Sequence, residues 1–189
     1  MNTESSAVIE SIVKDDSKAF EAKASSVDGV TYEELKNDIL SGKTVETVLD
    51  SNKVNTVSNE TTNAAVAAAE SQLGGGAKVA GSYDIQVKLI VDGKQKANIT
   101  SLDNAIQLQI DLPEEIITVP SGYSREVAIV RLHDGVATVI AKGNVSDLGS
   151  TITCSSNLFS EYVLVYRDTL NYVYTKPAAK KPVVNTSVR

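Results

Sequence analysis

The sequence predicts a mainly β protein with helices in its N-terminal part, an α+β chain in which a small helix-containing unit precedes an antiparallel β-sandwich. Two observations support this. The 189-residue chain has no Trp and only two Phe, so its core must be built from Val, Ile, Leu and Ala, and β-branched residues pack well on a pleated sheet. After residue 77, short strand-like segments alternate with turn signals about every 8–12 residues, as in a β-sandwich or barrel.

Alternating apolar residues give the clearest strand signals. Every second residue from 85 to 91 is apolar, so one face of that strand is apolar and the other polar. Residues 105–110 alternate in the same way, and Pro113 ends that segment. We therefore predict one strand in each segment, each with one face turned to the core.

Two Asp-Gly dipeptides mark the expected hairpins. Asp92-Gly93 and Asp134-Gly135 each separate two strand-like segments, and Asp-Gly tolerates the positive φ angles of a tight type I′ turn. Residues 151–168 add two further predicted strands.

The N-terminal part carries helix signals. Apolar residues recur at helical spacing within residues 5–24. Thr31 and Glu34 have the spacing of a capping box, in which each side chain bonds a free backbone N–H at the start of a helix. We predict a helix over residues 32–41, ended by Gly42 because glycine enters the left-handed conformation cheaply.

The segment before the sandwich is mixed in character. Residues 43–57 are rich in Val and Thr and predict an extended strand with a turn near residues 50–52. The Ala run at 64–69 favours a helix, with the Asn and Thr residues before it supplying a cap. The Gly-rich residues 74–76 end that helix and predict a flexible joint. They carry no phosphate-loop motif, which needs a following Lys and Ser or Thr.

These signals divide the chain into four parts. Residues 1–30 form an N-terminal segment with helical character, residues 31–76 a small α+β unit or appendage, residues 77–170 the antiparallel sandwich, and residues 171–189 a basic linker containing Pro. Glycines at 74–76 favour separation of the second part from the sandwich. Its shortage of apolar residues favours packing on the sandwich, because so small a unit rarely stabilises itself. We expect two units in contact.

Composition limits the class of function. The net charge is −6 with a pI near 4.9, so nucleic acid is an unsuitable partner. Cys154 is the single cysteine, which excludes an internal disulfide and a cysteine-based metal cluster. The first 30 residues lack the apolar core of a signal peptide, and no run has the length of a membrane span. We therefore expect either a cytoplasmic chain or a piece of a longer protein.

Four candidate sites have simpler structural interpretations. His133 and Asp134 suggest a catalytic pair, but neighbouring strand residues point to opposite faces, and we expect His133 to be an exposed strand-end residue beside the turn. The carboxylates of Asp111, Glu114 and Glu115 suit glycoside hydrolysis or calcium, but a solvated loop is the preferred interpretation. Cys154 lacks partners for zinc. We expect no catalytic, cofactor-binding or metal-binding residues.

An aromatic row in the closing strands is the remaining candidate. Phe159, Tyr162 and Tyr166 suggest a carbohydrate platform. Tyr162, Leu164 and Tyr166 share one parity, and Val163 and Val165 share the other. We predict that one set forms core and the other surface, and we prefer core packing to a platform for the aromatic residues.

Four blocks carry a resemblance to a known family. They are Ser82–Ile85 at a strand start, Gln109–Pro113 at a strand end, Val130–Gly135 at a hairpin and Thr151–Asp168 at the closing strands. Together they resemble a β-sandwich module of large wall-anchored surface proteins from low-GC Gram-positive gut bacteria. The resemblance covers residues 80–168, about half the chain. A Phe of the family's penultimate strand is replaced near Cys154, so that core position should be smaller.

The resemblance implies a setting and a role. Such modules often precede a Lys/Pro-rich wall-spanning segment, which residues 175–189 resemble with four basic and no acidic residues. We expect a secreted, wall-attached protein whose export and sorting signals lie outside this chain. The expected function is a non-catalytic structural stalk module, with an adhesin-type module for glycan, mucin or host protein as the alternative. We expect a monomer whose basic tail contacts anionic wall polymer, with no membrane span and no cofactor.

Overall fold

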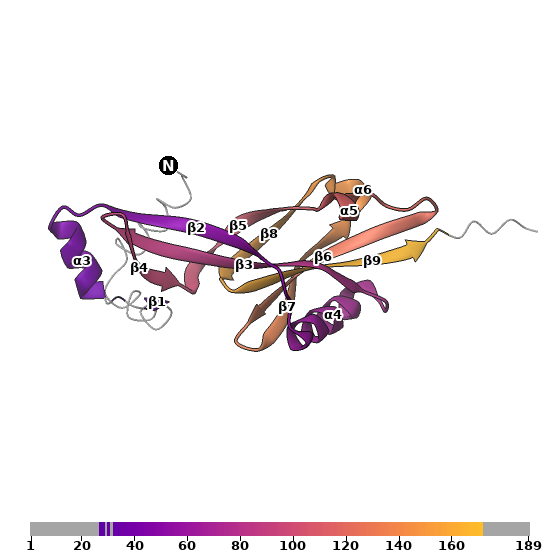
Figure 1. Cartoon of the computed structure of the whole chain (residues 1–189), viewed down its shortest axis with the longest axis horizontal. Coiled ribbons are helices and arrows are strands. Elements are labelled where there is room, and N and C mark those ends of the chain that lie inside the picture. The colour runs from indigo at the N-terminus through magenta and orange to yellow at the C-terminus, as the bar shows by residue number, and fades with distance from the viewer. Residues whose placement is uncertain (1–26, 29, 31, 172–189) are drawn as a thin grey trace, which may run out of the picture.

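The computed structural model describes residues 27, 28, 30 and 32–171, and its strands form two antiparallel sheets (Figure 1). The larger sheet contains β1 (Val27–Asp28), β2 (Val45–Val54), β3 (Lys78–Val91), β4 (Lys94–Ile99), β6 (Tyr123–His133), β7 (Val136–Asn144) and β9 (Glu161–Leu170). The smaller sheet contains β5 (Ser101–Asp111) and β8 (Thr151–Leu158). The predicted mainly β, α+β class with an antiparallel sandwich is confirmed.

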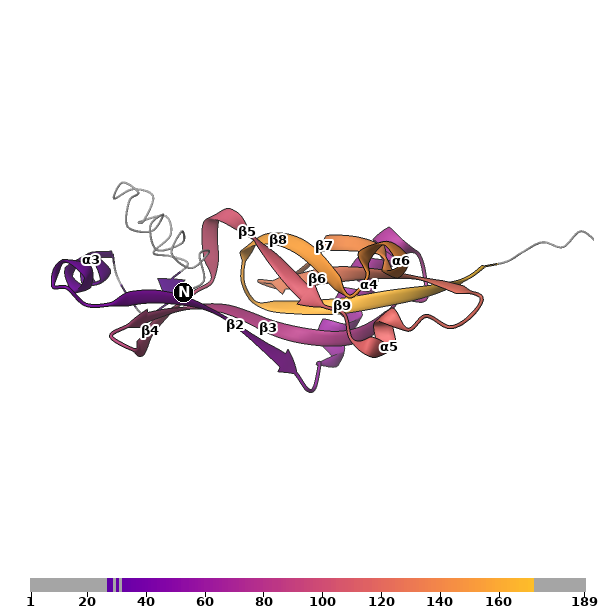
Figure 2. The same ribbon diagram turned by 90° about the horizontal axis from the view of Figure 1, so that it is seen from above.

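Strand β3 is the centre of the larger sheet. Along one edge it pairs with β2 from residue 82 to residue 91. Along the other edge it pairs first with β9, over residues 78–84, and then with β4, over residues 87–91. The order β1-β4-β3-β9-β6-β7 follows, with β2 also on β3. The first half of β3 therefore lies in the sandwich, and the second half continues into an extension that gives the molecule its elongated form (Figure 2).

Both predicted hairpins are confirmed. The turn between β3 and β4 has φ angles of 48° at Asp92 and 74° at Gly93, and the turn between β6 and β7 has 49° at Asp134 and 76° at Gly135. Positive φ at both central residues is the signature of the type I′ turn, whose twist matches that of the flanking strands.

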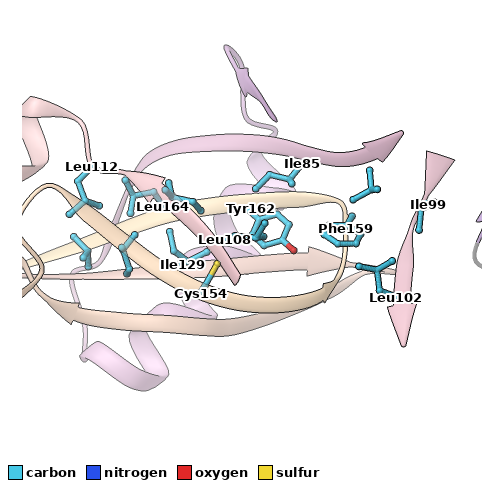
Figure 3. Close-up of a cluster of buried hydrophobic side chains, with 14 of the residues drawn as sticks. Ile85, Ile99, Leu102, Leu108, Leu112, Ile129, Cys154, Phe159, Tyr162 and Leu164 are labelled. Carbon is cyan, nitrogen blue, oxygen red and sulfur yellow. The ribbon is translucent and has the colours of Figure 1, made fainter. Parts of the chain in front are cut away.

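The larger sheet has a separate core on each face. One core lies between it and the β5–β8 pair and contains large side chains such as Ile85, Ile129, Tyr162 and Leu164 (Figure 3). The other lies beneath the helix α4 (Asn59–Leu73), which covers the opposite side of the sheet (Figure 1). Apart from Leu73, its members have small side chains: Ala65, Ala69, Ala77, Ala128, Val130, Val163 and Val165.

Two predicted helices are present, the one over residues 32–41 and the one around the Ala run at 64–69. α3 (Tyr32–Leu40) matches the helix predicted over residues 32–41. α4 begins after Ser58, whose hydroxyl accepts a hydrogen bond from the Thr61 amide at 3.0 Å. Two single-turn helices, α5 (Glu114–Ile117) and α6 (Val145–Leu148), connect strands. Residues 5–24, Thr31 and residues 172–189 lie outside the described residues, so the helix, the capping residue and the linker expected there stay predictions.

Strand β9 holds both ends of α4. At the start of the helix, the Glu161 carboxylate accepts hydrogen bonds from the hydroxyls of Ser82 at 2.6 Å and Thr61 at 3.3 Å. At its end, the guanidinium of Arg167 donates to the carbonyl oxygens of Leu73 and Gly75. An anion at the N-terminus and a cation at the C-terminus both match the helix dipole.

Two local predictions were wrong. No turn interrupts residues 50–52, because β2 pairs with β3 residue by residue from Val45 to Val54 and this pairing keeps the chain extended. The Gly-rich residues 74–76 are not a free joint. The Glu70 side chain accepts the amide of Gly76 at 2.7 Å, and Arg167 bonds the Gly75 carbonyl, so both neighbours restrain the segment. None of the described helices has the length and apolar character needed to cross a membrane.

Candidate binding groove

A groove of about 490 Å³ opens between the face of the larger sheet and the edge of the smaller one. Its lining comes from Leu49 and Ser51 of β2, Tyr83 and Ile85 of β3, residues 107–111 of β5 and Thr153 of β8. The pairing of β2 with β3 sets Ser51 opposite Ile85, which places both side chains on the groove face. The groove therefore has an apolar floor and a polar rim.

The edge of β5 forms one wall of this groove. Within the described part of the chain, β5 pairs with β8 alone, so its other edge has no strand beside it. The Leu112 amide bonds the Ser150 carbonyl at 2.8 Å. Because antiparallel residues alternate between pointing toward and away from their partner strand, Gln107, Gln109 and Asp111 turn their backbone groups away from β8. These groups lie along the groove.

One end of the groove is acidic. Asp111 ends β5, and Glu114 and Glu115 begin α5, all three exposed. The pKa of the Tyr83 hydroxyl is raised, first by burial and then by the negative charges of Glu115 and Asp111. Asp111 lines the groove together with Tyr83. Among the described residues, no group of three His, Cys, Asp or Glu side chains is arranged to hold a metal ion. The cluster supplies charge to the groove.

His133 and Asp134 lie closer together than the strand pattern predicts. Nε2 of His133 is 3.5 Å from Oδ2 of Asp134, with 20% of the His133 side chain and 91% of the Asp134 side chain exposed. The prediction of opposite faces was wrong because Asp134 is a turn residue with positive φ, and His133 is partly buried where we expected exposure. A carboxylate in open water interacts weakly with its partner, so the pair lacks the buried, oriented geometry of a catalytic Asp–His unit.

Two residues of the aromatic row belong to the core, and the third, Tyr166, is partly buried against it. Phe159 and Tyr162 are buried, and the Tyr162 hydroxyl donates to the Leu158 carbonyl inside the sandwich. The prediction that the other parity forms surface was wrong, because Val163 and Val165 are fully buried beneath α4. Cys154 also faces the interior, and burial raises its pKa to about 11. A thiol with so high a pKa is a poor nucleophile at neutral pH.

An ion pair at the end of the sandwich was missed by sequence reasoning. It joins the buried Arg125 side chain, 6% exposed, to Asp168, whose side chain is 27% exposed. Nε and Nη2 of Arg125 bond the two carboxylate oxygens of Asp168 at 2.6 and 2.8 Å. Nη1 donates to the carbonyl oxygens of Glu115 and Ile116, and the guanidinium lies 4.6 Å from the ring centre of Tyr166. The hydrogen bond from Arg125 holds the pKa of Asp168 below its usual value. All three nitrogens of the guanidinium are hydrogen-bonded, and through Nη1 this arginine fixes α5 to the sheet.

Comparison with known proteins identifies no relative. No family model matches the chain, and neither a curated protein nor a solved structure resembles it significantly. The resemblance of residues 80–168 to bacterial surface modules therefore stays a prediction from sequence.

Proposed function

We propose that this chain is a non-catalytic, load-bearing module of a bacterial cell-surface protein, which positions other domains beyond the cell wall. One observation carries the proposal. The strands run along the long axis of the molecule, with α3 at one end and the C-terminal end of β9 at the other (Figures 1 and 2). A force applied through the chain would therefore act along the strands.

The pairing of the strands suits such a force. β2 pairs with β3 over ten residue pairs, and β9 pairs with β6 over ten and with β3 over six. Hydrogen bonds in antiparallel sheets lie perpendicular to the strands. Pulling β2 and β9 toward opposite ends therefore loads these bonds together in shear, with β3 passing the load between them.

The cell-surface setting rests on the sequence. The blocks within residues 80–168 resemble wall-anchored surface modules, and residues 175–189 carry four basic and no acidic residues. Such a segment is attracted to anionic polymers of the kind that fill a Gram-positive wall. In this proposal the full-length protein is extracellular and wall-attached, and the basic segment contacts the wall.

Single-molecule force spectroscopy tests the load-bearing role. The full chain is pulled from its two termini, and a control carrying Lys142→Cys is pulled from that site on β7 and from the C-terminus. The control direction peels the edge strand β7 from β6 one pair at a time. We expect a clearly higher rupture force between the termini, because forced unfolding reports the unfolding barrier. Equal forces in both directions would rule out the load-bearing role.

The groove favours a second candidate, an adhesin-type module that binds a glycan or a host protein. Its apolar floor and the polar edge of β5 are typical of a recognition site. A glycan array and binding assays with mucin would compare the wild type with Ser51→Trp, which fills the groove, and with Thr138→Trp on exposed β7. Binding lost only in Ser51→Trp supports this candidate. An absence of binding, or loss in neither variant, contradicts it.

A further inference from the structure

The edge of β5 poses a structural problem. An unpaired strand edge presents free N–H and C=O groups to any extended chain, and proteins usually protect such edges with charges, Pro or a covering segment. The residues whose backbone groups face outward, Gln107, Gln109 and Asp111, include no Pro and no Lys, and the first two carry no charge. The edge also borders an open groove with an apolar floor. These features fit a site for one more strand.

We propose that residues 183–188 of the same chain add to the free edge of β5 as a third strand of the smaller sheet. This inference does not depend on the load-bearing role. It concerns only the edge of β5 and the segment 183–188 that we place on it. Docking on β5 and the wall contact proposed for residues 175–189 are alternative states of that segment, because Lys180 and Lys181 cannot face the groove and the wall at once.

The sequence of the segment has the period of a strand. Val184, Thr186 and Val188 share one parity and Val183, Asn185 and Ser187 the other. All of the first set are β-branched, which suits a half-buried strand. They match the groove floor formed by Leu49, Ile85, Leu108 and Ile110. Pro182 stands immediately before the segment, at the strand start where Pro is tolerated.

Charge sets the direction of entry. Lys180 and Lys181 directly precede the segment, and the acidic end of the groove carries Asp111, Glu114 and Glu115. Entry at this acidic end places opposite charges together. The segment then runs from Asp111 toward Gln107, antiparallel to β5.

The connection is long enough. The amide of Asn171 bonds the carbonyl of Gly122, and Asn171 lines one hollow together with Ile117 of α5. α5 begins three residues after Asp111, so the chain leaves β9 beside the element next to the acidic end. Residues 172–182 provide a spacer that spans up to about 36 Å when extended. Tethering also gives the segment an effective concentration on the order of millimolar.

Disulfide trapping in the full chain tests the docking. Antiparallel entry at Asp111 sets Asn185 opposite Gln109, so we expect the Gln109→Cys, Asn185→Cys variant to form an intramolecular disulfide under mild oxidation. The product is a monomer about 2 Da lighter than the reduced chain. Cys154 should not interfere, because it is buried with a pKa of about 11.

Two control cysteine pairs each include one cysteine in residues 172–189. Ala179→Cys with Gln109→Cys places the second cysteine in the spacer, and Asn185→Cys with Lys142→Cys places its partner on β7. We expect the docked pair to form at least roughly tenfold faster than both controls. Equal rates in all three pairs would overturn the proposal. A disulfide-linked dimer would also overturn it, because the occupant would then be the segment of a second copy.

Hydrogen exchange gives an independent readout without cysteines. If the segment docks, the amides of Gln107, Gln109 and Asp111 are hydrogen-bonded, and Asn185→Pro, which removes the N–H that faces the Gln109 carbonyl in the docked strand, should speed their exchange roughly tenfold or more. Ala178→Pro in the spacer is the matched control and should leave the exchange unchanged. Fast exchange of these three amides in the wild type would overturn the proposal.

Discussion

The two faces of the larger sheet are covered in different ways. On one face, the β5–β8 pair packs through large side chains such as Tyr162 and Leu164. On the other, α4 packs through alanines against Val163 and Val165, while Glu161 and Arg167 hold its two ends. Small side chains remove little apolar surface from water, so we infer that the helix depends more on its end contacts than the strand pair does.

The two faces also differ in the ion pairs that β6 and β9 form on them. Arg125 faces Asp168 across the two strands, and Glu126 faces Arg167. The first pair is bidentate, with the Arg125 side chain 6% exposed, whereas Arg167 and Glu126 approach to 3.6 Å with 28% and 37% exposed. Parity places the first pair on the strand-covered face and the second on the helix-covered face. Burial should make the first pair far more important for stability.

The largest expected effect is on the strand-covered face. Tyr162→Ala removes a fully buried ring and its hydrogen bond, so we expect the free energy of unfolding to fall by about 3–5 kcal/mol. Urea denaturation followed by circular dichroism measures this loss. Tyr123→Ala, at an exposed tyrosine, should have a far smaller effect. Equal losses in the two variants would show that the ring of Tyr162 is not a core contact.

Asp168→Asn should rank second. It leaves the buried Arg125 guanidinium without its anionic partner, and we expect a loss of about 2–3 kcal/mol. Glu126→Gln, its counterpart on the other face, should cost less than about 0.5 kcal/mol. Chemical denaturation measures the free energy of unfolding of both variants. A larger loss in Glu126→Gln than in Asp168→Asn would show that the pair on the helix-covered face is the more important one.

The same pair predicts a pH dependence. The pKa of Asp168 is lowered from 3.8, first by its hydrogen bond from Arg125. A lowered folded-state pKa contributes stability above the unfolded value, and this contribution is lost as the pH falls through the folded value. Between about pH 5 and pH 2, the wild type should therefore lose more stability than Asp168→Asn. Parallel pH profiles would show that Arg125 does not stabilise the carboxylate.

The helix-covered face should reject a larger side chain. Ala69 is fully buried between α4 and the sheet, whereas Ala67 is exposed on the same helix. We expect Ala69→Leu to cost about 1–3 kcal/mol through overpacking, and Ala67→Leu to cost almost nothing. Thermal unfolding of both variants checks this. A neutral Ala69→Leu would mean that α4 does not rest closely on the sheet.

The end contact of α4 should have the smallest effect. Arg167→Gln removes the charge that bonds the carbonyl oxygens of Leu73 and Gly75, and we expect a loss of about 1 kcal/mol. Hydrogen exchange in the last turn of α4 should rise in this variant, with a weaker rise in Arg167→Lys, which keeps the charge. Unchanged exchange in Arg167→Gln would show that packing alone holds this end.

Local sequence patterns predicted most strands, turns and helices correctly. Features that depend on contacts between distant segments were not predicted. The alternation at 85–91 and the Asp-Gly turns depend on neighbouring residues, and both predictions are confirmed. The burial of Val163 and Val165 depends on α4, a segment about 100 residues earlier in the chain. Period-2 alternation cannot show that a strand is covered on both faces, which is why we assigned one parity to the surface.

The candidate groove also depends on contacts between distant segments that the sequence does not reveal. The acidic residues at 111–115 were visible in the sequence, but their place at one end of a groove follows from the spatial arrangement of β2, β3 and β5. Arg125 and Asp168 lie 43 residues apart, and only the register of β6 with β9 brings them together. A sequence-based search for opposite charges would offer many such pairs and no reason to choose this one.

The change of partner along β3 affects the stiffness of the whole molecule. On one edge, β9 pairs with β3 as far as Asp84 and β4 pairs with it from Val87, so the strand pairing on that edge is interrupted between these residues. On the other edge, β2 continues without a break from residue 82 to residue 91 of its partner. β2 therefore pairs continuously past the point where β3 changes partner on its other edge, and so it should stiffen this region. It joins the sandwich to its extension on its own edge of β3. On the opposite edge, the bonds from the Ile85 amide to the Ser160 carbonyl and from the Phe159 amide to the Thr100 carbonyl make the connection.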